Sequence, residues 1–144
     1  MTEHIESVEF EGRQFALIVR RRFAAEGVHF FTPGEYSQQL AYMAHPKGKL
    51  IAPHLHAHVR REVSLTQEVL LIREGRLRVD FYGEDRRYLD SRVLEAGDVI
   101  LLSAGGHGFE VLDDIVMYEV KQGPYAGDQD KVRFDPVGEA GPRG

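Results

Sequence analysis

The stretch EVLLIREGRLRVDFY, residues 68–82, has the most regular pattern in the sequence. Residues 68–75 form an apolar run that ends at Gly75. In residues 76–82, apolar and polar side chains alternate strictly, as they do in a half-buried β-strand. One face then carries the apolar side chains, namely Leu77, Val79 and Phe81. We therefore predict two strands here, the first of which ends at Gly75.

Short alternating runs separated by turns continue this pattern along most of the chain. Further strands are predicted over residues 13–20, 27–31, 38–45, 88–94, 98–102, 107–112 and 115–120, with an extended segment over 50–58. No long segment has apolar residues at helical spacing. The sequence therefore predicts an all-β sandwich or barrel. A length of 144 residues suits one domain. Residues 123–144, rich in Gly, Pro and charge, form a C-terminal extension that we expect to be frayed at its last few residues.

Composition narrows the partners and the chemistry. The net charge is −5, and the basic runs Arg20–Arg22 and Arg60–Arg61 are short and lie near acids. We therefore expect no nucleic-acid partner, because phosphate binding usually needs a basic face. No apolar run approaches membrane-spanning length, and the polar start MTEHIESVEF favours a cytoplasmic protein without a membrane partner. The absence of cysteine excludes disulfides and thiolate ligands.

The segment HLHAH, residues 54–58, holds three of the seven histidines. In a β-strand, His54, His56 and His58 would point to the same face. Three imidazoles on one face are either a solvated patch or the beginning of a metal site. These five residues alone do not decide between the two.

Two motifs around this segment resemble the two signature motifs of the cupin superfamily. The first comprises Gly48, five residues and His54-Leu-His56, followed by Glu68, six residues and Gly75; the second is GDVILLSAGGH, residues 97–107. The resemblance implies a double-stranded β-helix, or jelly-roll, with a barrel core over about residues 38–121. It also implies one divalent metal ion bound by four side chains, namely His54, His56, Glu68 and His107. Nitrogen and oxygen ligands of this kind suit Fe(II), Mn, Ni, Cu or Zn.

The chain departs from the family pattern in both motifs. The insert AHVRREVSLTQ, residues 57–67, is longer than the family's spacer, so Glu62 or His58 could replace a proposed ligand. We prefer Glu68, because its spacing to Gly75 matches the family and it begins an apolar strand. In the second motif, Ser103 stands in place of the family's Pro, Val111 stands in place of its Asn, and the spacing before His107 is one residue short.

Other side chains are open to two interpretations. Four aromatic residues could line a pocket or pack in the core, namely Tyr42, Phe81, Phe109 and Tyr118. Lys121 and Arg78 could anchor a substrate or lie on the surface.

The resemblance implies three classes of function. The first is a metal-dependent enzyme that acts on a small organic molecule, with an Fe(II)-dependent dioxygenase as the leading expectation. The second is an isomerase or epimerase of sugars or nucleotide sugars. The third is a non-catalytic module that binds a small ligand or a metal, since one fold hosts many activities. The resemblance also implies a homodimer, which strands apolar on both faces, such as EVLLI and DVILL, would suit.

Overall fold

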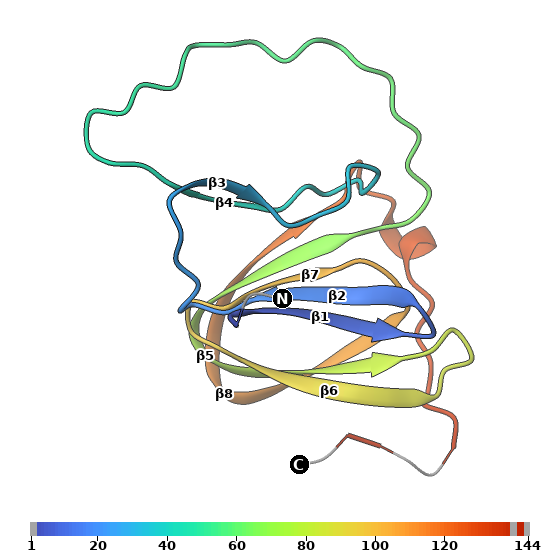
Figure 1. Ribbon diagram of the computed structural model, residues 1–144. Helices are drawn as coiled ribbons and strands as arrows, with labels where there is room; N and C mark the ends of the chain where they lie inside the picture. Colours follow the sequence, from blue (N-terminus) through green and yellow to red (C-terminus); the bar gives the residue numbers. More distant parts are fainter. Residues whose placement is uncertain (1–2, 139–140, 143–144) are drawn as a thin grey trace.

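The computed structural model describes residues 3–138 and 141–142 and is all-β. Its main sheet is antiparallel and curls into a half-barrel (Figure 1). In chain order the elements are β1 (Ile5–Phe10), β2 (Arg13–Val19), β3 (Gly27–Phe30), β4 (Ala41–Ala44), β5 (Glu68–Tyr82), β6 (Tyr88–Glu95), β7 (Val99–Leu102), β8 (Gly106–Lys121) and the 3-10 turn η1 (Gly127–Asp130). Within the described ranges, no helix is long and apolar enough to cross a membrane.

The main sheet has the strand order β1-β2-β7-β5-β6, and β8 pairs with β5. β3 and β4 form a separate two-stranded sheet beside it. The predicted strand at 13–20 corresponds to β2, and the two predicted strands at 107–112 and 115–120 are parts of the single strand β8. β1 and β2 contribute residues 5–19 to the main sheet, N-terminal to the barrel core expected over 38–121.

β5 is one continuous strand of 15 residues, so the prediction that a strand ends at Gly75 is wrong. Pairing with β8 extends from Glu68 to Tyr82, with register shifts on both sides of Gly75. Gly75 has φ +92, and a Cβ added there would lie 2.2 Å from the backbone oxygen of Asp114. The glycine therefore bends the strand without ending it, because only a residue without a side chain can adopt this conformation so close to β8.

The core explains why several strands are apolar on both faces. The larger buried cluster fills the concave side of the curled sheet, with Leu70, Ile72 and Ile100 among its members. A second cluster contains Leu17, Val69 and Leu101 and is covered by side chains from the β3–β4 region, namely Phe31, Tyr36 and Leu40. EVLLI and DVILL are thus covered mostly within the chain. They no longer support a homodimer, which stays a prediction.

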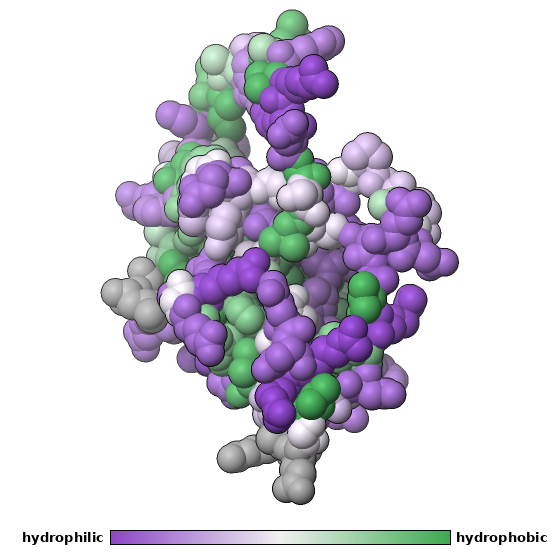
Figure 2. All heavy atoms as spheres, turned by 90° about the vertical axis from the view of Figure 1, so that its right-hand side faces the viewer, coloured by the Kyte–Doolittle hydropathy of each residue, from purple (hydrophilic) through white to green (hydrophobic). Residues whose placement is uncertain are grey.

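Residues 45–67 form a long loop without regular secondary structure, so the segment at 50–58 is not part of a sheet. Every residue from 45 to 65 is exposed, including Leu50 at 87% and Leu55 at 97% of full exposure. Figure 1 shows the loop as an arc that stands away from the half-barrel. In Figure 2 it projects from the top of the molecule and carries hydrophobic and hydrophilic atoms side by side.

The C-terminal extension lies along the half-barrel through Gly138. η1 lies close after β8, and Val137 forms an isolated parallel bridge with Arg87 at the β5–β6 turn. The extension is therefore attached to the barrel over the described positions. The expected fraying concerns the last residues, most of which (139–140 and 143–144) lie outside the described residues.

Candidate functional site

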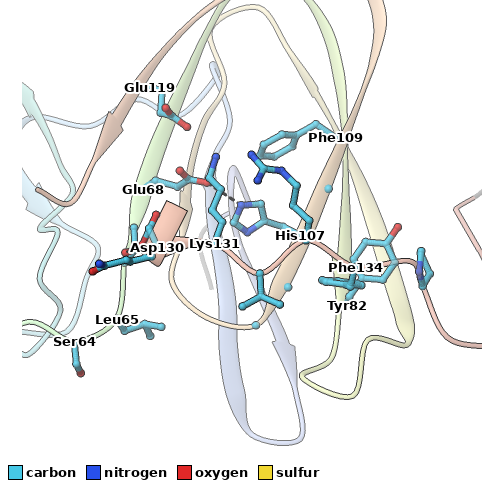
Figure 3. A pocket seen from close by; sticks show the side chains of 18 residues that line it. Ser64, Leu65, Glu68, Tyr82, His107, Phe109, Glu119, Asp130, Lys131 and Phe134 are labelled. Atoms are coloured by element: carbon cyan, nitrogen blue, oxygen red, sulfur yellow. Dashed lines mark hydrogen bonds and ion pairs between the residues drawn. The ribbon is translucent and has the colours of Figure 1, made fainter. Parts of the chain in front are cut away.

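Glu68 and His107 form the centre of the candidate site. Glu68 is the first residue of β5 and is only 6% exposed, whereas His107 is the second residue of β8. In the ladder these residues are far apart, since Glu68 pairs with Lys121 and His107 pairs with Phe81. Their side chains meet because the bent β5–β8 pair curls around the core. His107 Nε2 lies 2.8 Å from Glu68 Oε1 (Figure 3).

The surroundings of Glu68 favour its ionised form. Burial alone would raise the pKa of this carboxyl, because charge is poorly solvated away from water. A hydrogen bond from His107 and the charge of His107 oppose this effect, as do a hydrogen bond that Glu68 accepts from the Glu119 carboxyl group and the charge of Lys121. Together they lower the pKa of Glu68 to about 2. Lys121 Nζ lies 3.6 Å from Glu68 Oε2 and 3.4 Å from a carboxylate oxygen of Glu119. The site therefore holds a buried carboxylate between an imidazole and an ammonium group.

A pocket of about 730 Å³ opens over this pair. This volume suits a small organic ligand. Its walls combine aromatic rings and charged groups, including Tyr82, Phe109, Glu119, Lys131, Arg133 and Phe134. Figure 3 shows Glu68, His107 and Phe109 from the barrel facing Lys131 and Asp130 from the C-terminal extension.

His54 and His56 lie away from this pair, in the exposed loop. Their ring centroids are 5.3 Å apart, and the His54 Nδ1 atom is 2.9 Å from the carbonyl oxygen of Ala52. The alternatives His58 and Glu62 are exposed in the same loop. Of the four predicted ligands, the structure brings together Glu68 and His107. Among the residues that it describes, no group of three or more metal-binding side chains is assembled.

The four predicted aromatic residues have different positions. Phe109 lines the pocket and packs against His107, with ring centroids 5.3 Å apart. Phe81 is 1% exposed and belongs to the core. Tyr42 packs edge-on against Phe23 beside the two-stranded sheet, and Tyr118 is 58% exposed. Of these four aromatic residues, Phe109 alone lines the pocket.

The two candidate cations also differ. Lys121 is at the site, since it forms an ion pair with Glu68. Arg78 forms ion pairs with Asp80 and Glu110, both at 2.8 Å. Its charge is thus compensated by carboxylates of β5 and β8.

The sequence interpretation missed the contribution of the C-terminal extension. Lys131, Arg133 and Phe134 line the pocket, although they lie in a segment that is rich in Gly, Pro and charge. The signal was the alternation in KVRF, residues 131–134, which places both cations on one side of an extended chain. A run of four residues is too short to be distinguished from chance.

Comparison of the chain with protein-family models, with curated proteins and with solved structures found no match.

Proposed function

We propose that the protein is a metal-dependent enzyme that acts on a small organic molecule in the pocket above Glu68 and His107. The ligands that we propose are Glu68 and His107 from the barrel and His54 and His56 from the loop. The proposed fold is a cupin-type jelly-roll whose remaining strand comes from this loop. The observation that carries the proposal is the contact between buried Glu68 and half-buried His107, which line a pocket of about 730 Å³.

The donor atoms of this pair fit a divalent ion. Metal–nitrogen and metal–oxygen bonds are about 2.0–2.2 Å long, so two ligands at right angles around one ion are about 3 Å apart. The separation of 2.8 Å between His107 Nε2 and Glu68 Oε1 is close to this value. A carboxylate with a pKa of about 2 is also ionised at neutral pH, as a ligand must be. Two of the four proposed donors are therefore already side by side.

The free edge of β8 supports a closed position for the loop. Within the described residues, β8 pairs only with β5, so its other edge has unpaired backbone groups. The neighbouring side chains are apolar and poorly covered, since Val116, Tyr118 and Val120 are between 43% and 58% exposed. An edge of this kind readily accepts a further strand. Residues 54–58, HLHAH, have the alternating pattern of such a strand, and the segment over 50–58 exposes Leu50, Ile51 and Leu55.

The length of the loop allows this movement. Eleven residues, 57–67, lie between His56 and Glu68, so twelve Cα–Cα steps connect the two. An extended chain covers about 3.3 Å per residue, so this segment can span about 40 Å. Pairing with β8 would cover the exposed apolar side chains and bring the loop histidines toward Glu68 and His107. The ordering entropy of the loop opposes closure, and metal ligation would supply free energy that offsets it.

The proposed reaction is an Fe(II)-dependent oxygenation. The ion would supply a Lewis acid and an electron donor to a substrate bound in the pocket. The residues of the chain bind the ion, shape the pocket and, when the loop closes, exclude water. Phe109 and Phe134 offer apolar walls to the body of the substrate.

Metal content tests the proposed ligand set. Purified protein is loaded with Fe(II) or Zn(II), desalted and subjected to elemental analysis beside two double variants. We expect close to one ion per chain in the wild type, and a large loss in His54→Ala/His56→Ala. The matched control His29→Ala/His45→Ala, which removes two histidines outside the proposed site, should retain the ion. Equal occupancy in all three proteins would refute the ligand set.

Oxygen uptake tests the reaction. The Fe(II)-loaded protein is mixed with candidate diketones, thiols and flavonols in an oxygen electrode. We expect consumption of dioxygen with at least one class and no consumption by Glu68→Gln. If no candidate stimulates uptake by iron-loaded wild-type protein, an oxygenase is the wrong reaction for this site.

A metal-free isomerase or epimerase is the second candidate, and one observation favours it. His107 already forms a hydrogen bond with a buried carboxylate, an arrangement that orients an imidazole as a general base. Turnover of a sugar phosphate or nucleotide sugar that persists in excess chelator would support this candidate over the oxygenase.

A further inference from the structure

The C-terminal segment over residues 129–137 lies across the mouth of the pocket and forms one of its walls. Residues 129–134 and Pro136 line the pocket. Two contacts attach the segment to the barrel. The ring of Phe134 packs edge-on against Tyr82, with centroids 5.4 Å apart, and the backbone N–H of Val137 donates to the carbonyl oxygen of Arg86 at 2.9 Å.

Gly106 leaves room for this attachment. A Cβ added at Gly106 would lie 3.2 Å from an atom of the Phe134 ring and 3.2 Å from the Tyr82 Cβ atom. Arg86 also stacks on Phe134, with its guanidinium carbon 5.7 Å from the ring centroid. The segment is therefore fitted to the barrel at the pocket, and its side chains have defined positions there.

The acidic groups at the pocket already have partners. Glu68 is paired with His107 and Lys121. Glu119 is paired with Lys121 at 3.4 Å. Asp130 accepts a hydrogen bond from the hydroxyl of Thr66.

The two cations of this wall, Lys131 and Arg133, have no such ion-pair partners among the described residues. Neither Lys131 nor Arg133 forms an ion pair with any described residue, although both line the pocket. Lys131 has an extended backbone, with φ −121 and ψ 140. Lys131 and Arg133 line the same pocket, so the ammonium and the guanidinium can bind the same group.

We propose that Lys131 and Arg133 bind the acid group of an anionic substrate, a carboxylate or a phosphate, whose apolar body lies against Phe109 and Phe134. This inference rests on the proposed function, because it specifies the substrate class for the same pocket. Arginine and lysine are the usual donors to carboxylate and phosphate oxygens. Since both side chains are exposed at the pocket mouth, the attraction is sensitive to salt.

Calorimetric titration of the metal-free, full-length protein tests this inference. The probes are benzoate, phenyl phosphate and benzamide, of which benzamide is the neutral counterpart of benzoate. We expect at least one of the two anions to bind at least about tenfold more tightly than benzamide, because the neutral amide forms no charge-assisted hydrogen bond with the two cations. The tighter of the two anions identifies the acid group. Raising the salt concentration should weaken the binding of that anion and leave the binding of benzamide unchanged.

Two double variants assign the effect to the segment. Lys131→Gln/Arg133→Gln should weaken binding of the tighter anion by about tenfold or more, as expected from loss of charge-assisted contacts. The charge-matched control Arg22→Gln/Lys47→Gln, at exposed positions that do not line the pocket, should bind as the wild type does. Equal affinity of benzamide and the anions, equal affinity of both double variants, or no binding of either anion at millimolar concentration would overturn the inference.

The outcome is separable from that of the proposed function. Anion binding without any metal retention would refute the metal site and leave this inference standing. Metal retention without anion binding would refute this inference and leave the proposed metal site standing.

Discussion

Glu68 is a carboxylate at the first position of a buried strand. At 6% exposure it would be costly to bury alone, and the His107 imidazole and the Lys121 ammonium compensate its charge. The sequence favoured Glu68 over Glu62 because Glu68 begins an apolar strand. The structure agrees with this preference, because Glu68 is buried at the pocket whereas Glu62 is exposed in the loop.

The lowered pKa of Glu68 predicts how stability depends on pH. Its pKa is 4.5 in the unfolded chain and about 2 in the folded protein, so its ionised form is favoured by folding. This contribution, up to about 3 kcal/mol, is fully present above pH 4.5 and is lost as the pH falls toward 2. In urea unfolding of the metal-free protein, Glu68→Gln should therefore be less stable than the wild type at pH 7, and the difference should shrink by pH 3. A difference that stays constant over this range would contradict the assignment.

Gly75 provides a test at a second residue. Gly75→Ala should lower the free energy of unfolding by about 2 kcal/mol or more, because a Cβ at φ +92 is strained and meets the backbone of Asp114 at 2.2 Å. The matched control is Gly34→Ala, where a Cβ meets nothing within 4 Å. Urea unfolding of both variants is the measurement. Equal stability of the two would show that the bend does not depend on Gly75.

Among the elements, β5 and the loop show the limits of local pattern. The alternation in residues 76–82 predicted a strand correctly, because period 2 is a property of the segment itself. Whether Gly75 ends a strand or bends it depends on β8, which lies more than 30 residues further on and continues the ladder past the glycine. In the same way, the alternation in HLHAH suits a strand, but a strand also needs a partner edge. Sequence pattern alone supplies no partner.

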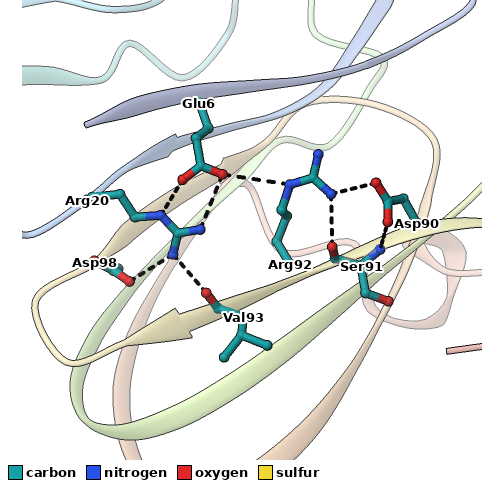
Figure 4. A network of polar contacts seen from close by, with 7 residues as sticks. All are labelled: Glu6, Arg20, Asp90, Ser91, Arg92, Val93 and Asp98. Carbon is teal, nitrogen blue, oxygen red and sulfur yellow. Dashed lines mark hydrogen bonds and ion pairs between the residues drawn. The ribbon is translucent and has the colours of Figure 1, made fainter. Parts of the chain in front are cut away.

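An ion-pair network connects β1, β2 and the turn before β7. Arg20 bonds to Glu6 and, at 3.1 Å, to Asp98, and it donates to the carbonyl oxygen of Val93 (Figure 4). Asp98 is 4% exposed and also accepts from the backbone N–H groups of Arg21 and Glu95.

Removal of the guanidinium tests this network. Arg20→Met should destabilise the protein by about 3 kcal/mol, because it leaves the Asp98 carboxylate buried without its cation. The exposed pair Arg13–Glu84 provides the control, since both side chains are at least 49% exposed and Arg13→Met should cost less than about 1 kcal/mol. Thermal or urea unfolding distinguishes the two. If the two variants lose similar amounts of unfolding free energy, burial of Asp98 does not determine the contribution of its ion pair with Arg20.

The proposed closure of the loop on β8 predicts a change in amide hydrogen exchange. In the metal-free protein, residues 50–58 should exchange rapidly, because they are exposed and outside any sheet. Addition of Zn(II) should slow exchange in these residues and along residues 115–121 of β8. The His54→Ala/His56→Ala variant should show no slowing with the same metal. Exchange in the wild-type loop that is unaffected by metal would exclude closure as the route to the site.

At the scale of the whole molecule, the pocket is formed by parts of the chain that have different sequence signals. The all-β class follows from short alternating runs and was predictable, whereas these runs left a sandwich and a barrel as alternatives. The meeting of Glu68 with His107 was expected only through the family resemblance, since nearly 40 residues separate them. The wall formed by Lys131, Arg133 and Phe134 was not predictable, because its position depends on the fit of one ring against Tyr82 and Gly106.

The central claim is that two side chains of the barrel and two of the loop bind one ion. X-ray absorption of the Zn(II)-loaded protein tests it most directly, because multiple scattering from imidazole rings reports how many histidines are bound. The account predicts three imidazoles and one carboxylate in the wild type, and a single imidazole in His54→Ala/His56→Ala. A zinc environment without imidazole scattering, or one that is identical in the variant, would contradict it.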